Sequence, residues 1–461
     1  MGGGTQAEDV LPAEALAYAE LDLNPSAGQK LAAVRFLRKF LETKERFEES
    51  KDPRASLWEL IAKDEEELSS LDYARDVEPW LGDRLGLAVL PPAAGEEEPE
   101  VAVALQVRNE ERARQGIPKL FEKSPDDEDP GFVVQDGYAV FAADHAAARR
   151  LAGAGQARSL AENPRFAADA ERLGDAGVSS GWVDLSRLRD VLTPEAAEVS
   201  AAELDVLKES MRGRLTYAVR FEGDDLELAV DGAELPDTEA YAGSAGVELG
   251  RLPASTVGAL GLVNGDEFVT TFWDRVVREL EATEPGAREE LAGFERESGL
   301  DLPADLAVLL GDSFLLALDA EELPDAPAVG AKVRTDGAHA ERVLRKVQDL
   351  AAQEGEELPV VTRRTGDGLL VAGDEDDLDR LAGGEDLGAA PSFRAALPEL
   401  ATADLAGYLD LDRIADTFVG EPEDDDERKV MEALRAVDAI GVTVSSDGKG
   451  DARFRLRVVT R

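Results

Sequence analysis

The feature that most constrains this chain is a series of short segments that occurs twice in the same order. Leu11-Pro12-Ala13 returns as Leu252-Pro253-Ala254, and Leu81-Gly82-Asp83 returns as Leu310-Gly311-Asp312. Four more pairs follow, separated by 226 to 231 positions: the turns Asp136-Gly137 and Asp367-Gly368, then the segments that begin at Arg150 and Arg380, Asn163 and Ala390, and Val183 and Leu409. Because the pairs are collinear and their offset drifts slowly, as small loop insertions would produce, the sequence indicates an internal duplication.

The duplication divides the 461 residues into two homologous units. We expect a flexible Gly-rich leader over residues 1–10, a first unit over 11–232, a junction over 233–251 and a second unit over 252–461. The junction is rich in Gly, Pro and acidic residues, which is typical of a segment between domains. The length agrees, because the chain is about three times as long as a typical ~150-residue domain.

Short apolar runs bounded by turn residues predict strands, as at 101–105 and 132–134, and Asp-Gly turns predict tight hairpins. A two-stranded ribbon is expected to close each unit, at 215–221 with 226–230 and at 440–444 with 454–459. Hairpins separated by helices predict an α+β fold with mainly antiparallel sheets, and a parallel α/β sheet is the alternative.

Helices are predicted from apolar residues that recur on one face of a helical period. In the first helix these are Leu31, Val34, Phe36, Leu37 and Phe40, and in the corresponding helix of the second unit they are Val269, Phe272, Trp273, Val276 and Leu280. Each apolar face is expected to pack on the core of its unit.

Residues that recur in both units are candidates for function, but each has a structural interpretation. Gly82-Asp83 and Gly311-Asp312 lie between a helical stretch and a strand, where Gly suits a left-handed helix C-cap and Asp suits the next turn. Asp184 to Arg187 and Asp410 to Arg413 have the spacing of a helix N-cap with a nearby ion pair. We therefore predict that these residues stabilise local structure rather than perform catalysis.

The chain carries 98 acidic and 50 basic residues, a formal net charge of −48, yet 43% of its residues are hydrophobic, enough to bury a core. Affinity for nucleic acid or anionic lipid depends on Lys and Arg displacing counterions, so the charge disfavours both partners. It permits cations, basic proteins or no specific partner. The densest acidic runs lie beside prolines and lack EF-hand spacing, which indicates solvated loops, with calcium binding as an alternative: Glu96–Glu98, Asp126–Asp129 and Glu423–Glu427.

Several kinds of enzyme site are excluded by residue content. The absence of cysteine removes disulfides, thiolate zinc sites and iron–sulfur clusters, and the two histidines, His145 and His339, are too few for a multi-histidine metal site. The two histidines are also not at equivalent positions, and the phosphate-loop, dinucleotide-binding, zinc-protease and nucleophile-elbow motifs are missing. We therefore assign no catalytic residue, no cofactor-binding residue, no metal ligand and no cofactor, and the sequence favours a protein that is not an enzyme.

Residues 11–40 carry the most specific pattern in the chain: Leu11-Pro12-Ala13, a strand-like segment from Ala17 to Leu23, the run from Asn24 to Lys30, and an apolar and basic helix. This pattern resembles the start of an actinobacterial family called domain of unknown function 3352 (DUF3352), and the resemblance extends over nearly the whole chain. The family has no established activity and no agreed catalytic residues, so the resemblance assigns none here.

The resemblance also implies a location. Members of the family typically carry a Pro-rich cytoplasmic tail and one membrane helix, followed by a Gly-rich segment and a large ectodomain. The run Gly2–Gly4 looks like that Gly-rich segment, with the part that precedes it missing from this chain. We therefore expect an extracytoplasmic protein, attached to the cell membrane only through such an N-terminal anchor, while the present chain, without a stretch of about 20 apolar residues, is soluble by itself.

These observations favour a non-enzymatic ectodomain at the cell surface, serving as a binding or structural module for an envelope ligand or protein partner that the sequence does not name. One alternative is a carboxylate-dependent hydrolase of envelope polymer, which needs two acids about 5–9 Å apart across a cleft. Against it, the four tryptophans occupy helix or strand positions typical of a core: Trp58, Trp80, Trp182 and Trp273. Another alternative is a lipid or lipoprotein carrier with an apolar cavity.

Overall fold

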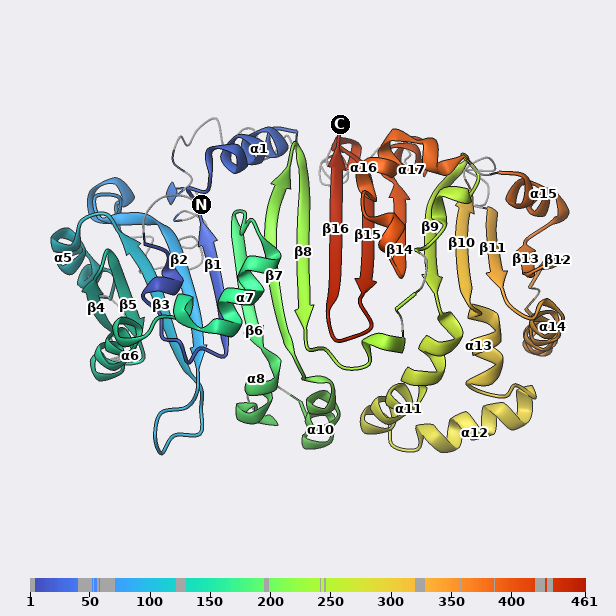
Figure 1. Ribbon diagram of the computed structural model, residues 1–461, viewed down its shortest axis with the longest axis horizontal. Coiled ribbons are helices and arrows are strands. Elements are labelled where there is room, and N and C mark those ends of the chain that lie inside the picture. Colours follow the sequence, from blue (N-terminus) through green and yellow to red (C-terminus); the bar gives the residue numbers. More distant parts are fainter. Residues whose placement is uncertain are drawn as a thin grey trace. The chain divides into compact units, whose positions relative to one another are not determined.

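The structure is a computed structural model (Figure 1). It describes residues 5–39, 52, 54–55, 58, 71–121, 130–194, 199–240, 242–243, 246–319, 328–356, 358–384, 386–418, 428 and 434–461. The chain divides into two compact units: unit 1 is Met1–Leu192 with Met211–Asp231, and unit 2 is Thr193–Ser210 with Gly232–Arg461.

The sheet of unit 1 has the strand order β8-β7-β6-β1-β2-β3-β5-β4. The pairs of β1 with β2 and β6, of β3 with β2 and β5, of β4 with β5 and of β6 with β7 are all antiparallel. The strands are β1 (Ala17–Asp22), β2 (Leu81–Leu90), β3 (Glu100–Val107), β4 (Gly131–Gln135), β5 (Tyr138–Ala142), β6 (Ser179–Asp184), β7 (Arg214–Glu222) and β8 (Asp225–Ala233).

The strands of unit 2 are connected in the same way, in the order β16-β15-β14-β9-β10-β11-β13-β12. In each unit the first strand along the chain lies between the second and the sixth. The strands are β9 (Thr256–Val263), β10 (Ser313–Asp319), β11 (Ala328–Arg334), β12 (Val361–Arg364), β13 (Gly368–Ala372), β14 (Leu405–Asp410), β15 (Val437–Ser446) and β16 (Ala452–Thr460). The prediction of an α+β protein with antiparallel sheets is confirmed, and a parallel α/β sheet does not match the described strands.

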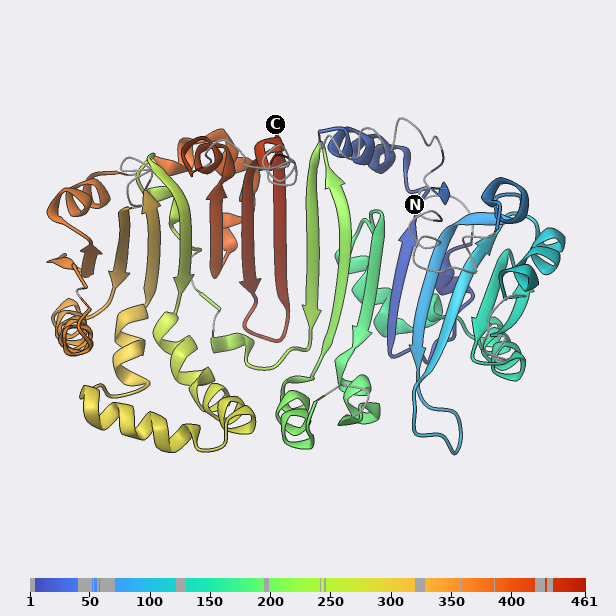
Figure 2. The same cartoon turned by 180° about the vertical axis from the view of Figure 1, so that it is seen from behind.

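Helices pack on both faces of the sheet of unit 1, and only the β1 to β3 part of one face, seen in Figure 2, leaves apolar side chains such as Leu87 and Val101 exposed. Alternation along the strands separates the two faces, since Ala104 and Val140 belong to the core under α6 and α7, whereas Leu105 and Ala139 pack with α5. The core-forming elements include η1 (Ala7–Asp9), α6 (His145–Ala157), η3 (Leu160–Glu162) and α7 (Pro164–Leu173). The other helices of unit 1 are α1 (Ala27–Leu37), η2 (Tyr73–Val77), α5 (Glu110–Phe121) and α8 (Leu185–Val191).

Unit 2 has a core of its own, in which Val247, Leu249, Phe393 and Tyr408 are buried. Several of its helices begin at a capping carboxylate, for example Asp336, which accepts hydrogen bonds from two backbone N–H groups. The helices are α10 (Ala201–Ser210), η4 (Thr238–Ala240), η5 (Leu249–Arg251), α11 (Gly265–Thr283), α12 (Ala287–Ser298), α13 (Ala304–Leu310), α14 (Gly337–Glu354), α15 (Glu375–Gly383), η6 (Leu387–Ala389), α16 (Pro391–Ala396), η7 (Leu400–Thr402) and α17 (Leu411–Phe418).

The folded part of unit 1 begins earlier than predicted. Residues 7–10 were expected in a flexible leader, but Ala7 and Val10 are buried in the core of unit 1. Gly86 on β2 allows this approach, because a Cβ at that position would clash with the Cβ of Ala7. In the same way, Val247 and Leu249, which were expected in the junction, belong to the core of unit 2.

The predicted helix faces are partly wrong. On α1 the buried residues are Gln29, Ala32 and Phe36, whereas Leu31 is 57% exposed. Gln29 decides this orientation, because its side chain exchanges hydrogen bonds with the backbone of Phe221 on β7. Phe40, also expected on this face, lies outside the described residues.

On α11 the buried residues are Gly265, Val269 and Val277, while Val276 is 54% exposed. The predicted face of Val269, Phe272, Trp273, Val276 and Leu280 is therefore only partly in the core. A stripe that includes Val269 and Val277 packs instead, because α11 contacts α10 and α13.

The Asp-Gly landmark forms a tight hairpin in unit 1, where Asp136 and Gly137 both have positive φ between β4 and β5. Its counterpart differs, because Gly368 is the first residue of β13 and the turn from β12 is longer.

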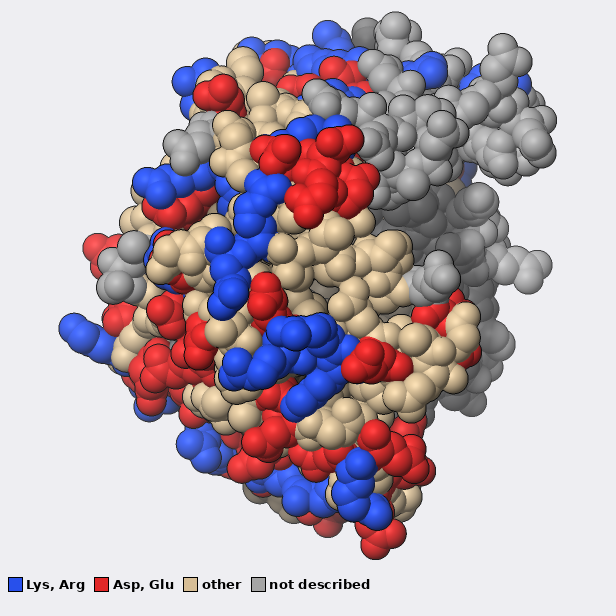
Figure 3. Space-filling view, turned by 90° about the vertical axis from the view of Figure 1, so that its right-hand side faces the viewer, with Lys and Arg blue, Asp and Glu red and all other residues tan. Residues whose placement is uncertain are grey.

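The acidic residues behave mainly as a solvated exterior. On the face in Figure 3, Asp and Glu side chains are intermixed with Lys and Arg over the described surface. The run Glu96–Glu98 is exposed in the loop between β2 and β3, as predicted. The runs Asp126–Asp129 and Glu423–Glu427 lie outside the described residues.

Candidate functional site

Unit 1 contains a pocket of about 700 Å³ on the face of its sheet that η1 and α7 cover. Its walls come from η1, β1, β6, α7 and the loop that follows α7, and the start of α1 contributes to the rim. Among the described residues that line it there are five acids and no lysine or arginine: Glu8, Glu20, Asp22, Glu171 and Asp175. The lining therefore favours positive charge.

The alternation of side chains along β1 puts its acidic residues on the pocket side of the sheet. Tyr18, Glu20 and Asp22 alternate along the strand, so their side chains point to the same face of the sheet. Glu8 reaches this face from η1, which lies close to the sheet because residue 86 is glycine. Two segments separated by a turn thus bring two glutamates to one tyrosine.

Glu8, Tyr18 and Glu20 form a contiguous polar cluster. The Oη atom of Tyr18 lies 2.9 Å from Oε2 of Glu8 and 2.9 Å from Oε2 of Glu20. Tyr18 is only 4% exposed. The second oxygen of Glu20, Oε1, is inaccessible to solvent and has no hydrogen-bond partner. Hydrogen bonds at this length are strong, and an unpartnered buried carboxylate oxygen is costly.

This environment disfavours negative charge on the cluster. Burial, followed by the charge of Glu8, raises the pKa of Glu20 from 4.5 to about 7. Burial also raises the pKa of Glu8, and burial with the two neighbouring acids raises the pKa of Tyr18 well above 10.0. Taking carboxyl groups out of water penalises their ionised form, which is the physical origin of these shifts.

Aromatic rings adjoin the cluster. The ring of Phe166 on α7 packs edge-on against Tyr18, with centroids 5.6 Å apart, and against Trp182 on β6 at 5.8 Å. Trp182 Nε1 donates to the buried carboxylate of Asp169, which also accepts from Arg214 Nε at 2.7 Å. The pocket thus has one aromatic wall and one carboxyl wall, and the buried charges beneath it are paired.

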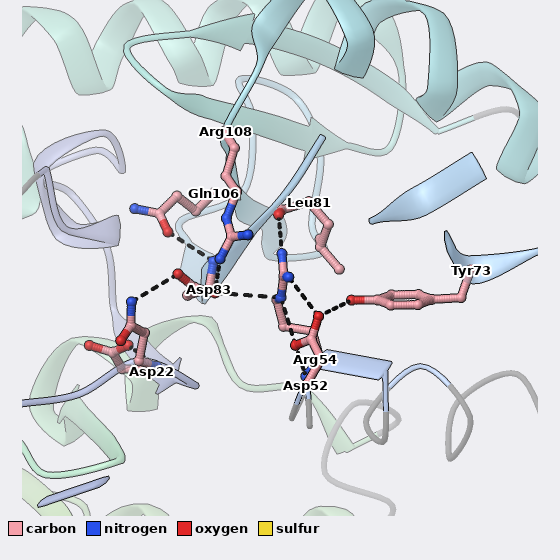
Figure 4. A network of polar contacts seen from close by, with 9 residues as sticks. Asp22, Asp52, Arg54, Tyr73, Leu81, Asp83, Gln106 and Arg108 are labelled. Carbon is pink, nitrogen blue, oxygen red and sulfur yellow. Dashed lines mark hydrogen bonds and ion pairs between the residues drawn. The ribbon is translucent and has the colours of Figure 1, made fainter. Parts of the chain in front are cut away.

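A second polar network fixes the end of β1 (Figure 4). The carboxylate of Asp83 on β2 accepts from Arg108 at 2.7 Å and from Asn24 at 3.0 Å, and the guanidinium of Arg54 lies 3.6 Å from it. Burial by itself would raise the pKa of Asp83, but the hydrogen bonds from Arg108 and Asn24 hold that pKa below its usual value. Asn24 also donates its backbone N–H to Asp22, so the network reaches the pocket wall.

These contacts correct the interpretation of the Gly-Asp landmark. Gly82 and Asp83 lie within β2 rather than at a helix C-cap, and Gly82 is needed because a Cβ there would lie 2.7 Å from Gln106. Gly311 does end a helix, α13, with a positive φ of 55°. The two glycines therefore serve different local purposes.

In both Asp-x-x-Arg segments the aspartate caps a helix N-terminus, as predicted. Asp184 accepts from the backbone N–H of Arg187, and Asp410 accepts from that of Arg413. In unit 1 the ion pair of Asp184 is made with Arg165, at 3.1 Å, instead of with Arg187. The guanidinium groups of Arg187 and Arg413 donate to backbone carbonyls at the end of the Leu-Pro-Ala landmark or just after it, at Glu14 and Ala15 in unit 1 and at Ala254 and Ser255 in unit 2.

The histidines occupy unrelated environments. His145 begins α6 and accepts from the backbone of Phe132 at 3.3 Å, whereas His339 on α14 lies 3.3 Å from Asp305. Neither of them lines the pocket. Of the tryptophans, Trp80 and Trp182 are buried, as expected of core residues.

Sequence reasoning did not identify Glu8, Tyr18 or Glu20 as site residues. A signal was present, because the strand-like segment from Ala17 to Leu23 carries tyrosine and two acids on the same alternate positions, and an alternating strand buries one of its faces. The contribution of Glu8 had no such signal, since it depends on how η1 folds back over β2.

The corresponding place in unit 2 is apolar. Tyr18 pairs with Ala88 and Trp182, and Ala259 pairs with the equivalent residues Ala317 and Tyr408. By the same register Glu20 corresponds to Gly261. The space over Gly261 is filled by Val247 and Leu249, which are both buried. The acidic cluster therefore distinguishes unit 1 from unit 2.

The fold and the pocket define an α+β protein with antiparallel sheets and a carboxyl-lined pocket in its first unit. The chain belongs to the family described as "Protein of unknown function (DUF3352)", whose model matches residues 2–367. The resemblance seen in the sequence is thus confirmed, over a shorter part of the chain than expected, since the match ends just before β13.

Other comparisons add little. A solved structure titled "Structure of crystal form I of TP0453" is 8% identical, with 51% of this chain and 80% of that chain covered and a TM-score of 0.24. At that score the likeness says nothing about fold or function. The curated proteins contain no match to this sequence. Across the described residues, none of the helices has both the length and the apolar character needed to cross a membrane.

Proposed function

We propose that this protein is a non-enzymatic binding module built from two homologous units, of which unit 1 carries the ligand site. The observation that carries the proposal is the pocket of about 700 Å³, since ligand sites are typically concave, with a few polar groups placed on an otherwise apolar wall. The identical strand order of the two units and the equivalent contacts of Arg187 and Arg413 support the internal duplication.

The alternative of a carboxylate-dependent hydrolase fits less well. Such enzymes hold two carboxyl groups apart so that a sugar or a water fits between them. Here Glu8 and Glu20 are bridged by the hydroxyl of Tyr18, which occupies the space between them. A carrier of anionic lipid is also disfavoured, because the described lining holds five acids and no basic residue.

Native mass spectrometry of the protein purified from its own host tests the binding role. We expect added mass from a small molecule, and we expect it to be lost in Ala170→Phe, which fills the pocket from α7. Ala168→Phe is the matched control, because residue 168 is exposed on the same helix and does not line the pocket. Absence of any ligand, or equal loss in both variants, would refute a binding role for this pocket.

We also propose that the protein lies outside the cytoplasmic membrane, and the family resemblance supports this proposal. The chain lacks cysteine, so a single Ala168→Cys substitution gives one labelling site on an exposed helical position. In intact host cells that express this variant, a membrane-impermeant maleimide should label it. Labelling only after lysis would contradict the location.

A further inference from the structure

Three oxygens meet in the Glu8–Tyr18–Glu20 cluster: Oη of Tyr18 and Oε2 of each glutamate. If both glutamates were ionised, these three oxygens would share too few hydrogens to form both hydrogen bonds. The phenol of Tyr18 has one hydrogen, which can point directly at one acceptor, yet two carboxyl oxygens lie 2.9 Å from Oη. A second hydrogen between these oxygens resolves the conflict. It belongs to a carboxylic acid, which donates to Oη while Oη donates to the other carboxylate.

The surroundings identify Glu20 as the protonated partner. Its Oε1 is buried without a hydrogen-bond partner, which a neutral acid tolerates much better than a carboxylate does. The hydrogen-bond chain then runs from the Glu20 carboxyl to Tyr18 Oη and on to the Glu8 carboxylate. The raised pKa of Glu20 agrees with this order.

Unit 2 shows that the fold does not require this cluster. The same strand order is built there with Ala259 and Gly261 in place of Tyr18 and Glu20, and with the apolar side chains of Val247 and Leu249 above them. Buried polar groups cost free energy unless something compensates for them. The presence of two acids and a phenol at the pocket of unit 1, where unit 2 has apolar residues, therefore points to a ligand.

We propose that the pocket binds a ligand with a cationic nitrogen on an apolar body, and that the positive charge of the ligand replaces the proton held by Glu20. The inference rests on the proposed binding function of this pocket. The nitrogen would lie at the Glu20 side of the cluster, with the apolar body against Phe166 and Tyr18, since aromatic faces attract cations as well as apolar groups.

The exchange conserves charge in the pocket, because one proton passes from Glu20 to solvent as one cation enters. The charged and titratable groups around Glu20 are Glu8 from η1, Asp22 and Tyr18 from β1, Arg84 from β2 and Tyr138 from β5. Arg84 is paired with Asp22 at 3.1 Å, and its charge lowers the pKa of Glu20 less than burial and Glu8 raise it. Proton release on binding predicts tighter binding as the pH rises from 6 to 8.

Isothermal titration calorimetry with hexylammonium and its neutral analogue hexanol tests the proposal. We expect hexylammonium to bind the full chain about tenfold more tightly at pH 8 than at pH 6, since the ionised fraction of Glu20 rises by about that factor, and hexanol to bind weakly at both. Titrations at pH 6 in buffers of different ionisation enthalpy should show close to one proton released. Glu20→Gln should abolish proton release and weaken hexylammonium binding at least tenfold at pH 8, whereas Glu171→Gln, which changes an exposed acid of the same pocket, should do neither.

Equal binding of hexanol and hexylammonium, no binding of hexylammonium, or binding without proton release would overturn the inference. Infrared difference spectra of wild type against Glu20→Gln test the proton without any ligand, since a neutral buried carboxylic acid has its own C=O band. Absence of that band at pH 6 would also overturn it. If a neutral or anionic molecule is found in the pocket by native mass spectrometry, the binding function stands and the cationic ligand class fails.

Discussion

Replacing a residue in a buried polar cluster usually destabilises a protein. Glu20→Gln should instead make this protein more stable at alkaline pH. Glutamine has the shape of the neutral acid and never ionises. In the wild type, ionisation of Glu20 leaves two carboxylates competing for the single hydrogen of Tyr18. The variant removes this conflict at every pH.

The sign and size follow from linkage between protonation and folding. The pKa of Glu20 is about 7 in the folded protein against an ordinary value of 4.5, so the folded state holds the proton more tightly. The resulting stabilisation is fully present below pH 4.5 and is lost as the pH rises through 7. At 1.36 kcal/mol per pKa unit, the free energy lost is roughly 3 kcal/mol. We therefore expect Glu20→Gln and wild type to be similar near pH 4.5 and the variant to be more stable by roughly this amount at pH 8.5.

Urea unfolding followed by tryptophan fluorescence measures this difference. A Trp273→Phe background leaves Trp58, Trp80 and Trp182 as reporters, and all three belong to unit 1. Comparing two variants at each pH cancels the contribution of the many other acids, provided that the ionic strength is constant.

Parallel stability profiles for Glu20→Gln and wild type between pH 5 and 8 would refute the assignment of the proton to Glu20. Glu171→Gln is the control, because it removes an exposed acid from the same pocket. If that variant produces the same change with pH, the effect comes from net charge and not from the buried cluster.

Three further outcomes test contacts within the two units. Gly86→Ala should displace η1 and lower the free energy of unfolding by about 1–3 kcal/mol in urea, since its Cβ clashes with Ala7. Asp83→Asn should lower the free energy of unfolding by about 1 kcal/mol at pH 7 in the same assay. This difference from wild type should disappear as the pH falls below 3.8, because the contacts that lower the pKa of Asp83 stabilise only its ionised form. Asp184→Ala and Asp410→Ala should each cost about 1 kcal/mol by thermal unfolding, and clearly unequal costs would contradict equivalent caps.

The local features of the fold were readable from the sequence. Alternation predicted strands, and the Asp136-Gly137 turn gave the hairpin between β4 and β5. The Asp184 and Asp410 caps were predicted from spacing, because an N-cap involves residues three apart. Interactions of such short range depend on little beyond the neighbouring residues.

Helix orientation was harder to predict, and α1 shows why. Its apolar periodicity favoured a buried Leu31, but the helix presents Gln29 to the sheet, where the amide satisfies the backbone of Phe221. Those two residues are far apart in the sequence. A hydrogen bond to a distant strand therefore outweighed the burial of one leucine, and no local pattern reveals such a partner.

The candidate site also combines features that the sequence predicts with contacts that it does not. The sequence by itself determined that Tyr18, Glu20 and Asp22 lie on one side of β1, because a strand has a period of two. Only the tertiary structure decided that Glu8 meets them, that the place of Glu20 in unit 2 belongs to Gly261, and that the acids enclose a pocket. The physical reason is that protonation and ligand binding depend on burial and on distances between segments, and both exist only once the chain has packed.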